Sequence, residues 1–413
     1  MPRMAEEGET GNGNTRNLLL LMISRATRSF AAGFIAVVIG LYYTSHLGLS
    51  LTLVGIIFGA GALATPILTL FTGRMADLYG RKRLLLLSLL LLPGSLAIVL
   101  VSTYFPLLVV SAAMGGFGIA GGLVGGGVGA IAAPMQTALL AEKTSSGNRT
   151  RVFSVFTIIS TLSGSTGALL SNVHSYHTLF YLALIISLVS AIAILPVHED
   201  FKRPEHSAGA RKEKTAKTSK NRKIISMFSA TGTLNGASQG LIIPFLPIIL
   251  RLAFNMSNGQ IGDLFSVGGF LTAAATTITP YATKKIGFVK LIMATRTFST
   301  IFLAIFPFAP GVLAASLFYI VFTALRAMSL PSQQALMMTL VDEEYRASAT
   351  GVNQTARLLP AAGATAASGS VQDYLGILIP FELASAISFF NVFVYYRFFW
   401  KMPAAGSTRD TST

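Results

Sequence analysis

Long apolar segments alternate with short polar ones along nearly the whole chain. An α-helix rises about 1.5 Å per residue, so about 20 apolar residues cross the hydrocarbon core of a bilayer, which is roughly 30 Å thick. We predict a membrane-spanning helix in each of twelve segments: 17–45, 49–73, 83–103, 105–141, 150–172, 177–197, 223–253, 258–283, 288–308, 311–340, 348–369 and 374–398. The pattern therefore predicts an all-α membrane protein.

Positive charges give an independent test of this topology. If both termini lie on one side, most of the Lys and Arg residues outside the spans fall on that side, at Arg346 and in the ranges 74–83, 143–151, 202–223, 284–290 and 397–409. Only Arg251 lies near a connection on the other side. Because cytoplasmic loops carry the excess of Lys and Arg, we expect both termini in the cytoplasm and the protein in the plasma membrane.

The composition narrows the function classes. Hydrophobic residues make up 52% of the chain and charged residues 11%, whereas about a quarter of a soluble domain is charged. The net charge of +15 does not indicate a nucleic-acid partner, because the basic residues interrupt apolar runs without interleaved aromatic side chains. The chain has no Cys, and two of its five His, His174 and His177, share a loop. We expect no metal site, no cofactor and no enzymatic activity.

Two polar segments divide the chain. Residues 1–16 are rich in Gly, Glu and Thr, and we predict that they are disordered. The segment 198–222 is strongly basic, so we interpret it as a flexible cytoplasmic linker that could also touch anionic lipid head groups. It separates an N-terminal six-helix half, 17–197, from a C-terminal half, 223–402, which a short tail, 403–413, follows.

The two halves resemble each other in sequence. At an offset of 197, residues 134–171 align without gaps with residues 331–368. The identical pairs include Pro134/Pro331, Gln136/Gln333, Ala138/Ala335, Leu139/Leu336, Arg149/Arg346, Val155/Val352, Leu162/Leu359 and Ser171/Ser368. The repeat indicates two parallel copies of one six-helix unit.

The connection between the second and third predicted spans carries the most informative motif. Residues 73–83 read Gly-Arg-Met-Ala-Asp-Leu-Tyr-Gly-Arg-Lys-Arg. Gly73 and Gly80 would allow a close backbone approach and a sharp turn, and Asp77 would cap a helix or pair with a basic residue. A weaker copy at 284–290 has Lys284 where Asp77 stands.

The pattern Gly-x-x-x-Asp-x-x-Gly-Arg-Lys/Arg resembles the loop between helices two and three of major facilitator superfamily transporters. The resemblance implies two six-helix halves that rock about a site at the membrane midplane, with helices one, four, seven and ten lining a central cavity. Two patterns of the drug/proton antiporters in this family are missing. The fourth span has no basic residue before Lys143, and the fifth has no Pro in residues 160–171.

Polar side chains inside the spans are the candidates for a substrate site, because a charged group there costs roughly 2.5–3.5 kcal/mol on insertion scales. Most of them fall on the four helices expected to line the cavity. The substrate-binding candidates are Arg25, Arg28, Gln136, Asn235, Gln239, Arg326, Gln333 and Arg357. Structural roles stay open for four: Arg25 could extend to the membrane surface, Arg357 could join helix packing, and Asn235 and Gln239 could hydrogen-bond a neighbouring helix.

The charges inside the spans are unbalanced. Several Arg residues lie there, whereas Glu382 is the one acid clearly inside a span. This balance favours an anionic substrate over a cationic drug. Glu382 itself could pair with an Arg or carry a coupling proton.

These expectations describe a monomeric secondary transporter that moves a small solute, an organic anion, by alternating access with proton coupling. The gating candidates at the cytoplasmic side are Gly73, Asp77, Gly80, Arg81, Lys82, Glu142 and Arg149. The alternative with the same fold is a proton-driven multidrug efflux antiporter. A membrane sensor would need a larger soluble output domain than the linker at 198–222 provides.

Overall fold

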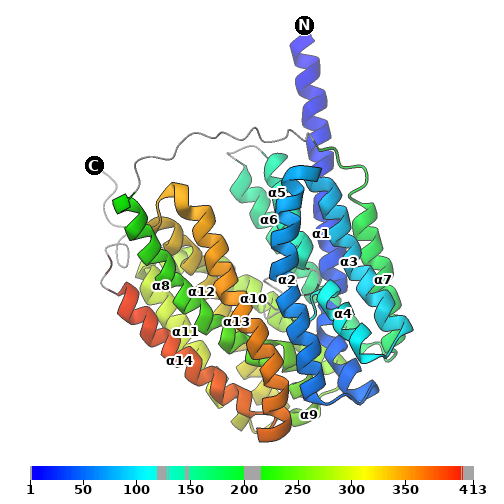
Figure 1. Ribbon diagram of the computed structural model, residues 1–413, viewed down its shortest axis with the longest axis vertical. Helices are drawn as coiled ribbons and strands as arrows, with labels where there is room; N and C mark the ends of the chain where they lie inside the picture. Colours follow the sequence, from blue (N-terminus) through cyan, green and yellow to red (C-terminus); the bar gives the residue numbers. More distant parts are fainter. Residues whose placement is uncertain are drawn as a thin grey trace.

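The computed structural model is helical in the part of the chain that it describes, residues 2–118, 128, 130–144, 148–199, 215–400 and 402 (Figure 1). The side chains of residues 2–14, 77, 149–150, 215–218, 343 and 347 lie outside this description. The α-helices are α1 (Pro2–Leu41), α2 (Leu51–Tyr79), α3 (Arg81–Val101), α4 (Phe105–Gly115), α5 (Ala133–Glu142), α6 (Arg149–Ala168), α7 (Tyr176–Ile192), α8 (Thr215–Ile242), α9 (Leu246–Phe254), α10 (Asn258–Ile286), α11 (Phe288–Ile305), α12 (Val312–Leu340), α13 (Arg346–Leu375) and α14 (Ile379–Phe399).

Nine of the twelve predicted segments each overlap one α-helix, the segment 374–398 overlaps the end of α13 and most of α14, and two contain a break. The segment 105–141 holds α4 and α5, and the segment 223–253 holds α8 and α9. After α4, Gly116 and Gly118 adopt left-handed backbone conformations that favour glycine. Between α8 and α9 a short 3-10 turn contains Pro244, which lacks the N–H that a continuous helix needs. Most of the Gly-rich run beyond Gly118 lies outside the described residues.

The boundaries differ from prediction at two polar segments. α1 begins at Pro2, so the helix extends through the residues before 17 that we predicted to be disordered. α8 begins at Thr215, inside the predicted linker, most of which lies outside the described residues. In the described part, nine helical stretches are long and apolar enough to cross a membrane, and α4 and α7 are shorter apolar helices. The count of twelve spans stays a prediction.

The helices run between two ends of one bundle (Figure 1). One end carries exposed basic residues, and we call it the basic end: Arg74, Arg83, Lys284, Lys285, Lys290, Arg346 and Arg397. The opposite end carries the connections at 42–50, 102–104, 173–175 and 309–311. The described positive charges of the connections thus gather at one end, with Arg251 in the last turn of α9 as the exception.

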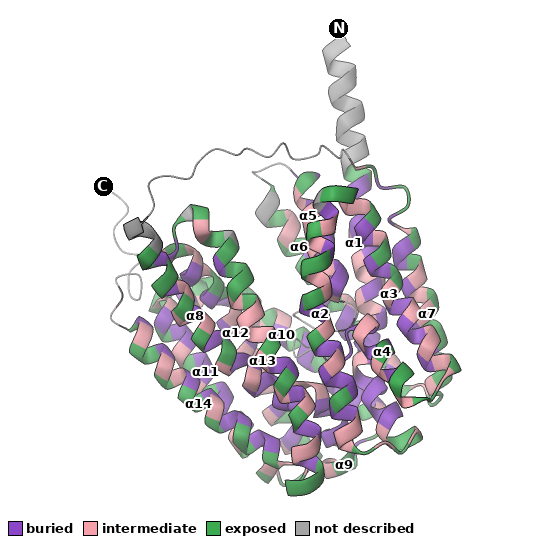
Figure 2. Cartoon of the chain, viewed as in Figure 1, coloured by how far each residue is buried: buried purple, intermediate pink, exposed green. Residues whose placement is uncertain are grey.

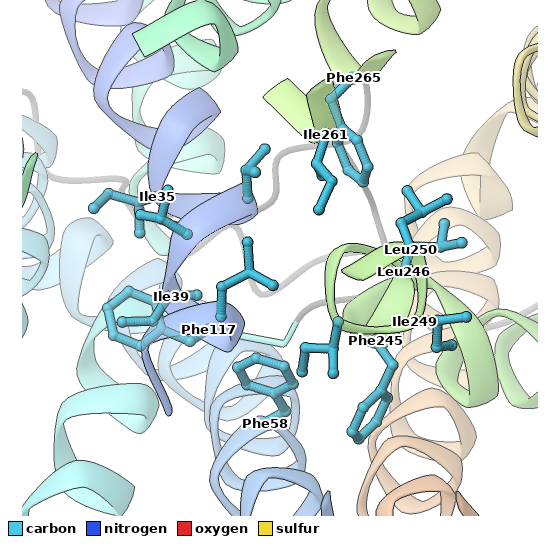
Figure 3. Packing of buried hydrophobic residues seen from close by; sticks show 14 of the residues in the cluster. Ile35, Ile39, Phe58, Phe117, Phe245, Leu246, Ile249, Leu250, Ile261 and Phe265 are labelled. Carbon is cyan, nitrogen blue, oxygen red and sulfur yellow. The ribbon is translucent and has the colours of Figure 1, made fainter. Parts of the chain in front are cut away.

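One hydrophobic core joins the two halves toward the opposite end. It packs side chains of the N-terminal half against side chains of the C-terminal half, among them Ile35, Ile39, Phe58, Phe117, Phe245, Leu246, Ile249 and Ile261 (Figure 3). The rings of Phe58 and Phe245 meet across the two halves, with centroids 5.7 Å apart.

Toward the basic end the described cores are separate. One contains residues of the N-terminal half alone, such as Leu85, Leu139 and Ile194. The other contains residues of the C-terminal half alone, such as Phe228 and Ile292. Figure 1 shows the same arrangement: α2 and α13 lie side by side near the opposite end, whereas α5 and α6 stand apart from α8 and α12 at the basic end. The halves are therefore in contact at the opposite end and apart at the basic end.

Glycines let several helices approach closely. A Cβ atom on Gly236 of α8 would lie 1.9 Å from the carbonyl oxygen of Arg357 in α13, and one on Gly240 would lie 2.2 Å from that of Ala361. A Cβ on Gly369 of α13 would lie 2.0 Å from the carbonyl oxygen of Leu51 in α2. In a membrane the hydrophobic effect does not drive helices together, because lipid tails are as apolar as the side chains. Small residues let the backbones approach, and the resulting van der Waals packing holds the helices together.

Exposed positions occur along all sides of the helices (Figure 2), and many of them hold large apolar side chains. Leu87, Ile185 and Phe393, on three different helices, expose 59%, 56% and 60% of their surface. Water would make such a surface a strong aggregation hazard, whereas lipid solvates it. The exposure fits a multi-pass membrane protein.

Candidate functional site

The clearest polar contact between predicted site residues lies in the C-terminal half. Arg326 on α12 donates from Nη2 to the Oδ1 atom of Asn235 on α8, over 2.7 Å. Its guanidinium also lies 5.8 Å from the ring centroid of Phe322. The structure therefore brings together two residues that the sequence placed on the seventh and tenth predicted spans.

Two further Arg residues stand near Arg326. Its guanidinium is within electrostatic reach of Arg296 on α11 and Arg357 on α13. Arg357 is half-buried, and its Nη2 atom lies 3.5 Å from Oε1 of Gln354, one turn earlier in α13. The C-terminal half thus holds a cluster of three guanidinium groups, which we call the Arg cluster: Arg296, Arg326 and Arg357.

Sequence reasoning missed Arg296. It is buried, with 6% of its surface exposed, and it donates from Nη2 to Oε1 of Gln333 and from Nε to Oγ of Ser329 at 3.5 Å. Its guanidinium also lies 5.1 Å from the ring centroid of Tyr395. The signal was present, since Arg296 is a charged residue in the middle of the predicted span 288–308. This span is not one of the four expected to line the cavity.

The N-terminal half holds a second pair of basic residues on α1. Arg28 is buried, with 3% of its surface exposed. Arg25 is half-buried, donates from Nε to Oγ of Ser160 at 2.9 Å and lies 5.3 Å from the ring centroid of Phe156. Both partners belong to α6, so Arg25 is held against a helix of its own half. Both of its predicted roles, in substrate binding and in extension to the membrane surface, stay predictions.

The three predicted Gln residues occupy different surroundings. Gln136 on α5 is fully buried and its Nε2 lies 3.2 Å from Oγ of Ser24, which also lies 2.9 Å from Oγ of Ser190. Gln333, its counterpart in the repeat, contacts Arg296 instead. Gln239 is buried on α8, with 8% of its surface exposed. Gln136 and Gln333 therefore each contact residues of their own half.

The buried charges are all of one sign in the part of the chain that the structure describes. Buried basic residues are Arg28, Lys143 and Arg296, and none of the buried side chains there is an Asp or Glu. A buried charge is costly unless another group compensates it. Lys143 is compensated by Glu142, whose Oε1 lies 3.7 Å from its Nζ.

Glu382 does not meet the expectation placed on it. We predicted a span from residue 374, which would bury this carboxyl, whereas α14 begins at Ile379. Glu382 consequently lies in the first turn of α14, and its side chain is exposed. Glu382 therefore stands at the end of the helix and not clearly inside a span as predicted, and its role as an Arg partner or proton carrier stays a prediction.

The basic end is organised around Gly80. Its φ of 95° allows α2 to stop and α3 to start within one residue. The carboxylate of Glu199 then accepts hydrogen bonds from the backbone N–H groups of Arg81, at 2.5 Å, and of Lys82, at 2.9 Å. These are the first N–H groups of α3, where a negative charge is stabilised by the helix dipole. Glu199 was not predicted, because it sits at the start of the predicted linker.

Of the other gating candidates, some make polar contacts at the basic end and others do not. Arg81 pairs with Glu142 of α5 at 3.4 Å, and Lys82 donates from Nζ to the carbonyl oxygen of Leu195 at 2.7 Å. Gly73 lies inside α2, not at a turn, and no atom lies within 4 Å of where its Cβ would stand in this conformation. Its gating role stays a prediction. The side chains of Asp77 and Arg149 lie outside the described set, and their gating role stays a prediction.

Polar contacts also join the halves at the opposite end. Asp373, in the last turn of α13, accepts hydrogen bonds from the backbone N of Leu51 at 3.2 Å and of Thr52 at 2.7 Å. Nearby, Asn258 of α10 donates from Nδ2 to the hydroxyl of Tyr176 of α7 at 3.2 Å. Both contacts cross from one half to the other.

The comparisons with known proteins agree with this architecture. The family model described as Major Facilitator Superfamily matches residues 21–234 and 228–412. Among solved structures, the crystal structure of the nucleoside transporter NupG matches with a TM-score of 0.74 and 16% sequence identity, covering 93% of this chain and 100% of that chain. None of the curated proteins matches the sequence. The residues matched by the family model span most of the chain, which therefore belongs to the Major Facilitator Superfamily.

Proposed function

We propose that the protein is a secondary transporter that moves a small organic anion by rocking its two halves about a site between them. The observation that carries the proposal is the distribution of the apolar cores. One core joins the halves at the opposite end, and the other two keep within one half each at the basic end. Such a bundle is closed at the opposite end and open at the basic end, where the halves could approach each other.

The direction of opening follows from the charges. We infer that the basic end is cytoplasmic, because cytoplasmic loops carry the excess of Lys and Arg. The conformation described above is then the one in which the site communicates with the cytoplasm. In the other conformation, the contacts of Asp373 and Asn258 would break while the helices at the basic end approach each other.

The choice of an anion rests on the buried charges. Arg28 in the N-terminal half and Arg326 in the C-terminal half are predicted to face the same path, and none of the buried side chains in the described part is acidic. A carboxylate or phosphate on the solute would compensate these charges, because a guanidinium binds such groups in a bidentate manner. Glu382, exposed in the first turn of α14, stays the candidate carrier of a coupling proton.

Uptake into proteoliposomes tests the proposal. We expect labelled benzoate, succinate or glycerol 3-phosphate to enter faster than into protein-free liposomes, with and without an imposed pH gradient. Uridine is included because NupG, which shares the fold, is a nucleoside transporter. Faster uptake under the gradient would support proton coupling, and equal rates would contradict it.

Matched variants identify the site. Arg326→Gln should lower uptake of the transported anion at least about tenfold, since a charge-assisted hydrogen bond contributes about 1.5–3 kcal/mol and about 1.4 kcal/mol changes an equilibrium tenfold. Arg397→Gln, at an exposed Arg in the last turn of α14, should leave uptake unchanged. If uridine is taken up and none of the three anions is, the proposed substrate class changes from an organic anion to a nucleoside. No uptake of any of the four solutes would contradict the transport of these classes altogether.

A further inference from the structure

The surroundings of Arg296 fix how its guanidinium is oriented. The Nε and Nη2 atoms form one edge of that plane, and both donate to α12, to Ser329 and Gln333 respectively. One face of the plane lies against the ring of Tyr395 on α14. The remaining atom, Nη1, is buried without a hydrogen-bond partner among the described residues. Three helices therefore hold the charge in place, and no acid among the described residues forms an ion pair with it.

This arrangement decides which end of the Gln333 amide is free. A guanidinium has only donors, so the group that faces Arg296 must be the carbonyl oxygen of Gln333. The amide Nε2 atom of Gln333 does not take part in this contact. It has no partner in the described part of the chain, and it is not among the polar atoms sealed from solvent.

Gln333 and Arg326 lie on the same side of α12. They are seven residues apart, which is two helical turns and about 10 Å along the axis. Leu330 lies between them, four residues after Arg326 and three before Gln333. Both side chains are long enough for their N–H groups to converge over Leu330. Gln333 is the one nearer the basic end, where the two halves are apart.

We propose that Arg296 is a positioning residue of the anion site: it holds the Gln333 carbonyl so that the amide Nε2 and the guanidinium of Arg326 together bind the anionic group of the solute. The inference rests on the proposed function and adds the two residues, Gln333 and Arg326, that bind the anionic group of the solute. Arg296 does not touch the solute. It orients one donor and adds a positive charge behind the site.

A labelling experiment tests this without knowing the solute. The chain has no Cys, so one thiol can be placed at Leu330 or, on α13 beside Arg357, at Gln354. The rates of reaction with an anionic methanethiosulfonate (sulfonatoethyl) and a cationic one (trimethylammonioethyl) are compared with those of a free thiol. We expect the Leu330→Cys protein to favour the anionic reagent at least about tenfold, because local positive charge concentrates anions.

Second substitutions then separate charge from orientation. Arg296→Gln should lower the anionic preference about threefold or more, and Gln333→Glu should do the same because its carboxylate would pair with Arg296. Arg296→Lys should restore the preference, since it keeps the charge. Benzoate bound at the site should slow labelling of the Leu330→Cys thiol. Gln333→Met should keep the preference for the anionic reagent but lose this protection by benzoate, because the Nε2 donor is missing.

The outcomes are distinct. A thiol at Thr103, in the connection between α3 and α4, serves as the control and should be unaffected by Arg296→Gln. An anionic preference that survives both Arg296→Gln and Gln333→Glu, at Leu330 and at Gln354, would overturn the inference. The measurement does not depend on transport. Loss of uptake in proteoliposomes with the expected labelling pattern would therefore contradict the proposed function and leave the anion site standing.

Discussion

Asp373 accepts two hydrogen bonds from Thr52, one from the backbone N at 2.7 Å and one from the side-chain hydroxyl at 2.6 Å. The two residues belong to different halves of the bundle, Asp373 to the end of α13 and Thr52 to the start of α2. The carboxylate therefore caps the helix of the other half, at the positive end of its dipole. The contact lies at the end where the halves are joined and must break when that end opens.

Asp373→Asn should shift the protein toward the conformation open at this end. The variant keeps one acceptor but loses the negative charge, and hydrogen bonds to a charged group contribute about 1.5–3 kcal/mol. We expect the population open at this end to rise about tenfold. Distances between spin labels at Thr103 and Tyr374, measured by double electron–electron resonance, should show a second, longer component.

The matched control for this shift is Asp263→Asn. Asp263 is an exposed acid on α10 of the same half, and none of the hydrogen bonds or ion pairs described here involves it. Its substitution should leave the distance distribution unchanged. An unaltered distribution in Asp373→Asn would show that the apolar core around Phe58 and Phe245 alone keeps this end closed.

Glu199→Ala should destabilise the protein without opening the opposite end. It removes the acceptor for the first two N–H groups of α3, and loss of a helix cap costs about 0.5–2 kcal/mol. Thermal unfolding in detergent should therefore occur at a lower temperature. Glu199→Gln keeps an acceptor oxygen and should recover part of the loss, whereas equal stability of all three proteins would rule out the cap.

The sequence was sufficient where apolar length or backbone geometry decides the structure. The sequence alone predicted most of the spans and the turn at Gly80. It also singled out Arg326 and Asn235, because they are polar residues inside apolar spans. The breaks at Gly116 and Pro244 could have been placed from their residue types, since both interrupt helices.

Tertiary contacts explain what the sequence did not predict. Glu199 acts on α3 because the chain returns to Arg81 after α7, and nothing in the polar sequence around it indicates that return. The error at Glu382 came from a boundary: five residues decide between the first turn of a helix and its interior. Arg296 was recognisable by the same rule as Arg28, a charge in the middle of a span, but its partner Gln333 was assigned directly to the solute.

The approach of α8 to α13 leads to the last prediction. Gly236→Ala would place a methyl group 1.9 Å from the carbonyl oxygen of Arg357, a backbone atom that cannot move by itself. The helices must separate, so we expect a lower unfolding temperature and, because Arg357 moves, a changed reactivity of a thiol at Gln354. Gly363→Ala on α13 is the control: no atom lies within 4 Å of its Cβ position, and Ala favours a helix over Gly by about 1 kcal/mol. Gly363→Ala should therefore be as stable as the unmodified protein or more so, and equal stability of both variants would mean that α8 and α13 are not packed this closely.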